Sequence, residues 1–107
     1  MSEIAKTPTP PYYAVIFTSY RTGGDNGYSQ VATRMVELAS KQPGFLGAES
    51  ARENVGITVS YWKDIDSIKQ WKKNIEHIDA QEKGRDTWYS SFKTRICKVE
   101  SDYEFSK

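Results

Sequence analysis

The chemistry that this sequence can offer is concentrated in one predicted helix. Its only histidine falls there, together with a row of uncharged polar side chains. At about 100° of rotation per residue, these side chains share one flank of the helix. They are Ser67, Gln70, Asn74, His77 and Gln81. Uncharged polar groups can line a pocket mouth at a lower desolvation cost than charged groups, which predicts a small-molecule site along this flank.

We predict that His77 serves as a general base or hydrogen-bond donor toward a phenol or enol, since histidine ordinarily changes charge near neutral pH. The alternative is a partly exposed helix-flank histidine with no chemical role. The single cysteine, Cys97, is expected to be a small buried side chain of a strand, without a partner that would activate its thiol.

Aromatic side chains supply the second set of candidates. Trp71 is predicted to lie in the core, whereas Trp62 ends a strand and is expected to line either the cavity or a seam between two copies. Tyr20, Tyr61 and Tyr89 can steer an aromatic ligand, or they can simply bridge core and water at strand ends. The substrate-binding residues predicted from the sequence are Trp62, Tyr61, Asn74, Gln81 and Tyr20, with His77 as the catalytic base.

Length and composition limit the partners of this chain. With 107 residues it is expected to form one domain, and its net charge of +1 gives no field that would attract nucleic acid or an anionic membrane. One cysteine and one histidine exclude an intrachain disulfide and a Cys/His zinc site. Without a long apolar run or a secretory signal, the protein is expected to be soluble and cytoplasmic.

The elements that would position these residues follow from hydrophobic periodicity. The first strand is apolar on both of its faces, so both must be covered. Asp25 or Asn26 is predicted to cap the first helix and Asp64 the second. The predicted order is a strand at 12–20, a helix at about 28–39, strands at about 45–52 and 57–62, a helix from 65 to about 84, and a strand at about 89–99.

This β-α-β-β-α-β order predicts an α+β, ferredoxin-like fold, with two helices on one face of a four-stranded antiparallel sheet. Two helices leave the second apolar face open, which predicts a homodimer that packs these faces together. Residues 1–11 are expected to form a flexible N-terminal arm, and residues 12–107 the domain.

Four stretches in this order resemble the antibiotic biosynthesis monooxygenase (ABM) domain family, and within it a branch of small stand-alone bacterial proteins. The stretches are YYAVIFTSYRTGGDNGY, RMVELASKQPGFLG, GITVSYWKDIDSIKQWK and EHIDAQEKGRDTWYSSF. The resemblance implies a dimeric α+β barrel with a pocket between sheet and helices in each protomer. Founding members oxidise polyketide-like aromatics with molecular oxygen and without metal or flavin.

A haem-degrading branch of that family provides a comparison by residue. Its strand-end tryptophan corresponds to Trp62, but Gln81 stands where those proteins have the iron-ligating histidine. Their asparagine near the end of the first strand has no counterpart, since Thr18, Ser19 and Tyr20 occupy that region.

The function predicted from the sequence is therefore a cofactor-independent monooxygenase for a small aromatic or polyketide-like metabolite, with no metal or other cofactor. The alternatives are a non-catalytic dimeric module that binds such a ligand and, behind it, a haem-degrading monooxygenase. An RNA-binding domain shares the order of elements, but this chain lacks the glycine-aromatic signature and the basic surface of those domains.

Overall fold

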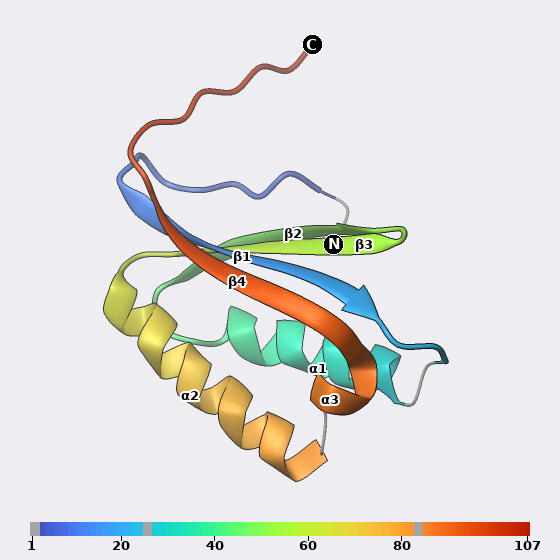
Figure 1. The fold of residues 1–107 in the computed structure, drawn as a ribbon. Helices are drawn as coiled ribbons and strands as arrows, with labels where there is room; N and C mark the ends of the chain where they lie inside the picture. The colour runs from blue at the N-terminus through green and yellow to red at the C-terminus, as the bar shows by residue number, and fades with distance from the viewer. Residues whose placement is uncertain (1–2, 25–26, 83–84) are drawn as a thin grey trace.

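The computed structural model describes residues 3–24, 27–82 and 85–107, with the backbone alone described at 78–82 and 85–86 (Figure 1). The main elements are, in order, β1 (Tyr12–Arg21), α1 (Tyr28–Ser40), β2 (Phe45–Arg52), β3 (Val55–Trp62), α2 (Ile65–Glu82), α3 (Arg85–Trp88) and β4 (Tyr89–Val99). The predicted order of strands and long helices is confirmed. The short helix α3 was not predicted.

The four strands form one antiparallel sheet in the order β2-β3-β1-β4. Tyr13 lies opposite Trp62 on β3 and opposite Lys98 on β4, which fixes the register across the centre of the sheet. This is the α+β, ferredoxin-like arrangement that the sequence predicts.

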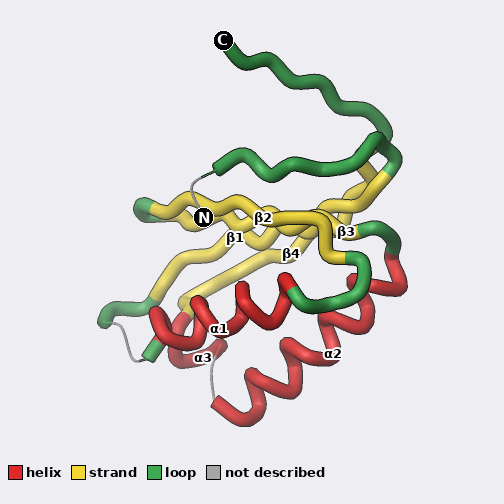
Figure 2. Tube along the Cα trace, turned by 180° about the vertical axis from the view of Figure 1, so that it is seen from behind, coloured by secondary structure: helices red, strands yellow, loops and turns green. Residues whose placement is uncertain are grey.

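Both long helices lie on the same side of the sheet (Figure 2). Because side chains alternate along a strand, Tyr13, Val15 and Phe17 point to this side, which we call the helix face. Tyr12, Ala14 and Ile16 point to the other side, the open face. The first strand is thus apolar on both faces, as expected.

The core lies between the helix face and α1 and α2. It contains Trp62, which is fully buried, with Ala39, Ile68 and Trp71. The rings of Trp62 and Trp71 stack with 6.2 Å between centroids, and Phe45 meets Trp62 edge-on at 5.4 Å. The prediction that Trp71 is a core residue is confirmed.

The connection from α1 to β2 depends on Gly44. Its φ of 84° is a left-handed conformation that other residues adopt only with strain, and a Cβ there would lie 2.1 Å from Ser67 Oγ. The Gly44 carbonyl accepts a hydrogen bond of 2.7 Å from Lys63 N–H, which ties this turn to the start of α2. At that start, Ser67 N–H donates to Asp64 Oδ1 at 2.8 Å, so the predicted cap of this helix is confirmed.

Three local expectations differ from the structure or fall outside it. β3 begins at Val55, two residues before the predicted start, because the hairpin needs only Glu53 and Asn54 for its turn. Cys97 was expected to be buried and is exposed, because it lies on the open face of an edge strand. The predicted caps of α1, Asp25 and Asn26, lie outside the described residues.

Residues 3–11 form neither helix nor strand and lie against the open face. Ala5 N–H donates to Glu49 Oε2 at 2.9 Å, and a Cβ at Gly47 would lie 3.0 Å from Ala5 Cβ. Tyr12 and Ala14 are accordingly only 4% and 5% exposed. Within the described part of the chain, no helix has the length and apolar character needed to cross a membrane.

Candidate functional site

A cluster of five aromatic side chains lies on the helix face at the end of the sheet where β1 meets α3. Phe17 is the centre, with ring centroids 5.3 Å from Tyr89 and 5.3 Å from Phe92. Tyr28, at the start of α1, meets Tyr89 at 5.7 Å and Trp88 at 6.1 Å, both edge-on. We call Phe17, Tyr28, Trp88, Tyr89 and Phe92 the aromatic cluster.

Local backbone irregularity brings this cluster together. The register between β1 and β4 shifts at Tyr20/Arg21, where Arg21 pairs with Tyr89 although Tyr20 pairs with Ser91. This bulge allows Tyr89 and Phe92, three positions apart, to approach the same ring of Phe17. Thr22 N–H donates to the Trp88 carbonyl at 2.9 Å and joins α3 to the end of β1.

The cluster is bordered by positive charge. The guanidinium carbon of Arg21 lies 3.6 Å from the centroid of the Tyr28 ring, a cation–π contact. Arg21 Nε donates to the Trp88 carbonyl at 3.1 Å, and its Nη2 donates to the Gly24 carbonyl at 2.9 Å, so three contacts orient this side chain. Arg52 donates to the hydroxyl of Ser19, which is 1% exposed and lies opposite Phe92 in the sheet.

Tyr89 is the titratable group most affected by these surroundings. Burial raises the pKa of its phenol, and a hydrogen bond with Tyr28 raises it further, while Arg52 and Arg21 act weakly in the opposite direction. At neutral pH this phenol is therefore protonated. It can donate or share a hydrogen bond, but it does not act as a base.

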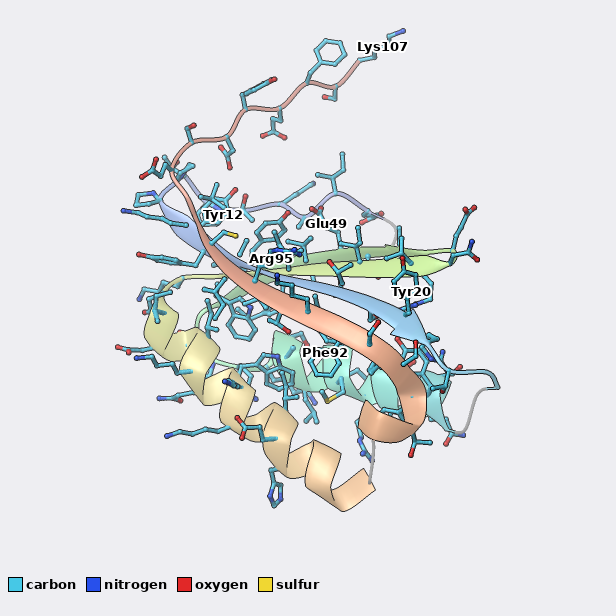
Figure 3. The ribbon with its side chains drawn as sticks, viewed as in Figure 1. Tyr12, Tyr20, Glu49, Phe92, Arg95 and Lys107 are labelled. Carbon is cyan, nitrogen blue, oxygen red and sulfur yellow. The ribbon has the colours of Figure 1, made fainter. Side chains whose placement is uncertain are left out.

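The cluster continues into exposed apolar surface on β4. Phe92 is 43% exposed and Ile96 is 53% exposed, although both belong to the helix face. α2 diverges from the sheet toward its C-terminal end and leaves this part of β4 uncovered (Figures 1 and 2). The side chain of Phe92 points toward the helices, on the side of the sheet opposite Tyr12 and Glu49 (Figure 3). A planar ligand can stack on this surface, and the positive charges of the two arginines favour an anionic one.

On the flank of α2 that was predicted to line a pocket, the side chains of Gln70, Asn74 and His77 are exposed. Asn74 Nδ2 donates to Gln42 Oε1 at 3.2 Å, which links α2 to the turn after α1. The side chain of Gln81 lies outside the described residues. A surface hollow does exist on α1, but it is lined by Ser29, Gln30, Thr33, Arg34 and Glu37 and shares no residue with the predicted site.

The predicted aromatic residues are also separated. Trp62 is enclosed in the core rather than lining a cavity or an interface, because its ring lies between Phe45 and Trp71. Tyr61 precedes it in the strand and therefore points to the open face, where its hydroxyl donates to Glu49. Tyr20 lies on the open face too and is 52% exposed. The predicted site residues thus occupy opposite sides of the sheet.

Because Trp62 is fully buried in the core, its position does not support a haem site in which this ring would contact the porphyrin. Among the residues that the structure describes, no group of three or more His, Cys, Asp or Glu side chains could hold a metal ion. Of the aromatic cluster, only Tyr89 was among the candidate residues predicted from the sequence. The available signal was the number of aromatic side chains close to the loop between β1 and α1 and at the start of β4.

Comparison with known proteins assigns this fold to a family. The family model described as antibiotic biosynthesis monooxygenase matches residues 11–83. The chain belongs to the ABM family. YqjZ, an uncharacterised protein of Bacillus subtilis strain 168, is 51% identical over 109 residues, which cover all of this chain and 96% of that relative.

Solved structures with the ABM fold agree over most of the chain. SnoaB, a cofactor-independent oxygenase from Streptomyces nogalater, superposes in a mutant form with a TM-score of 0.68 at 15% identity, over 85% of this chain and 95% of SnoaB. Protein SO0527 from Shewanella oneidensis gives a TM-score of 0.70 at 10% identity, over 92% of this chain and all of that protein. At such low identities, these similarities establish the ABM fold and not the chemistry.

Proposed function

We propose that this ABM protein is a cofactor-independent monooxygenase for a small aromatic or polyketide-like metabolite, which binds at the aromatic cluster. The observation that carries the proposal is the protonated phenol of Tyr89, set among aromatic rings within reach of the charges of two arginines and next to the exposed ring of Phe92. Family membership and the described activity of SnoaB support the same reaction class.

The reaction requires little from the protein. An anthrone-type substrate loses a proton to give an electron-rich anion, which reduces molecular oxygen. A methylene group becomes a carbonyl, and one oxygen atom enters the product while the other leaves as water. Arg21 and Arg52 stabilise the anion by their charge, and the phenols of Tyr28 and Tyr89 donate hydrogen bonds to it. His77 is exposed on α2. Its role as the base therefore remains a prediction.

Oxygen uptake with a panel of anthrones and hydroquinones tests this function. Wild type should consume oxygen, and Tyr89→Phe should lower kcat, because it removes the hydroxyl while keeping the ring. Tyr20→Phe, the same change on the open face, should leave the rate unaltered. Equal rates for the Tyr89 and Tyr20 variants would show that the reaction does not take place at the aromatic cluster. His77→Ala tests separately whether the imidazole is the base.

A non-catalytic binding module is the second candidate, because the same rings and arginines can hold an aromatic anion without reacting. Titration with hydroxyanthraquinones, followed by quenching of tryptophan fluorescence, distinguishes the two. Binding that Phe92→Ser weakens, without oxygen uptake on any substrate of the panel, would favour the module.

We also propose that the protein is a homodimer in which two open faces pack together. Ile16 and Val59 lie at the centre of this face and are half-buried, while Ile57 is 43% exposed. Cys97 lies on the same face and reports on its accessibility. Light scattering should give twice the chain mass, and the rate of thiol labelling at Cys97 should fall as protein concentration rises. A monomer at 50–100 µM, labelled at one rate throughout, would refute the dimer.

A further inference from the structure

The guanidinium of Arg52 lies across the helix face at the end of the sheet. Its Nη2 donates to Ser19 Oγ, and its Nη1 donates more weakly to the Ser19 carbonyl at 3.4 Å. The side chain of Arg52 is exposed, whereas Ser19 is only 1% exposed. Two bonds from one guanidinium to one residue hold this cation in a defined orientation although it faces water.

Gly56 provides the space in which the guanidinium lies. A Cβ at this position would lie 2.1 Å from Arg52 Cζ and 2.2 Å from its Nη2, so the charged group occupies the place of a side chain. The backbone of Gly56 is not in the left-handed region, so its conformation does not demand glycine. The requirement is therefore for space, and glycine inside a strand often marks such a close approach.

Arg52 retains donors that a ligand can use. A guanidinium has five N–H donors in a planar fork, which matches the two oxygens of a carboxylate. Among the residues that the structure describes, Ser19 is the only hydrogen-bond partner of Arg52. An exposed and oriented guanidinium is suited to bind a carboxylate that comes from solution.

The pairing of the strands relates this cation to the aromatic cluster. Gly56, Ser19 and Phe92 are direct neighbours on β3, β1 and β4. Two strand spacings therefore put the guanidinium above Gly56 about 10 Å from the position of Phe92. This separation is comparable to the length of a flat molecule of three fused rings. A ligand that stacks one outer ring on Phe92 can bring a substituent of its other outer ring to Arg52.

We propose that Arg52 selects aromatic ligands that carry a carboxylate on the ring far from Phe92, and that its guanidinium pairs with this carboxylate. The inference rests on the proposed function, because the ligand rings lie at the aromatic cluster. It adds the class of substrate, which is an aromatic or polyketide-like acid. Arg52 then holds a charge that the ligand already has, while Arg21 stabilises the anion that forms in the reaction.

The alternative role of Arg52 is to cover the Ser19 hydroxyl and nothing more. That role needs one donor and no charge, so glutamine could perform it. The two roles therefore differ in what the replacement of Arg52 by glutamine does to the binding of a charged ligand.

The affinities for danthron and rhein test the selection. These compounds are the same dihydroxyanthraquinone without and with a carboxylate on one outer ring, and quenching of tryptophan fluorescence measures both. Wild type should bind rhein about tenfold more tightly than danthron, because the carboxylate gains charge-assisted hydrogen bonds. Arg52→Gln should bring the two affinities within about twofold of each other, while that of danthron changes little.

Gly56→Ala keeps the guanidinium and changes only its position, since the new Cβ displaces the end of a flexible side chain. It should lower the preference for rhein by about threefold or more. Arg95→Gln removes the same charge from the open face, so it is the matched control and should preserve the preference.

A wild type that binds both ligands equally, or a preference that Arg52→Gln leaves intact, would overturn the role of Arg52. Ring binding at the aromatic cluster would then still stand. A wild type that binds neither ligand at about 100 µM would overturn the selection together with the proposed binding site.

Discussion

Trp62 is a core residue in this structure, and the loss of stability when it is replaced tests whether it also borders a pocket. The side chain is 0% exposed, it contacts the rings of Phe45 and Trp71, and its Nε1 donates to Ser60 Oγ at 2.9 Å. Replacing a buried tryptophan with alanine ordinarily costs about 3–5 kcal/mol, because the transfer free energy of the ring is lost and a cavity is left. For a domain of ordinary stability, about 5–15 kcal/mol, this is a large share of the total.

Trp62→Phe separates the ring contacts from the hydrogen bond. Phenylalanine keeps most of the apolar contacts but leaves the Ser60 hydroxyl without its indole donor. We expect a loss of about 1–2 kcal/mol for this variant, well below that of Trp62→Ala.

Urea unfolding monitored by far-UV circular dichroism measures both effects. With a slope of about 1.5–2 kcal/mol/M, Trp62→Ala should lower the midpoint by about 2 M. Protein concentration must be equal throughout, because dimerisation would itself add to the apparent stability. Val36→Ala, on the exposed side of α1, should change the free energy of unfolding by no more than about 0.5 kcal/mol.

A loss below about 1.5 kcal/mol for Trp62→Ala would refute this reasoning. It would mean that the indole borders a hollow from which it can be removed at little cost. The interpretation of Trp62 as a ligand contact would then return, and the aromatic cluster would lose its standing as the better site.

Three further predictions concern the helix cap, the open face and the N-terminal arm. Asp64→Ala should lower the melting temperature while Asp64→Ser preserves it, since either oxygen can accept the bond from Ser67 N–H; equal losses would deny the cap. Burial, and then Glu49, raise the pKa of Tyr61 above its ordinary 10.0, so its contribution to stability is complete below pH 10 and falls as pH rises further. Tyr61→Phe should therefore flatten the loss of stability measured between about pH 10 and 11.5. Glu49→Ala should speed tryptic cleavage after Lys6 by about tenfold, because the carboxylate no longer holds Ala5 N–H, whereas Tyr61→Phe should not.

The fold could be predicted because its signals are local. Alternating and helical periods identified the strands and both long helices, and Pro43-Gly44 marked a turn whose glycine has a φ of 84°. The same alternation also carried information about the site that the sequence reading did not use. Tyr61 and Trp62 are neighbours in one strand, so they cannot both line a pocket on one side of the sheet.

The aromatic cluster could not be predicted in the same way. Tyr89 and Phe92 are three residues apart, a spacing that places them on opposite sides of a regular strand. They meet the same ring of Phe17 because the register shifts near Arg21, and a bulge of this kind has no reliable mark in the sequence. Arg21 needs no such shift, because regular alternation from Phe17 along β1 places it on the helix face, where it contacts Tyr28.

The exposure of His77 has a different physical origin. Helical periodicity correctly placed Ile68, Trp71 and Ile75 against the core, and it correctly placed Asn74 and His77 beside that stripe. Periodicity gives the direction of a side chain about the helix axis but not the distance between that axis and the sheet. α2 leaves the sheet as it proceeds, so its polar flank reaches the turn after α1 at Asn74 and then water (Figure 1). The divergence leaves part of β4 uncovered, and this is the surface where we propose that a ligand binds.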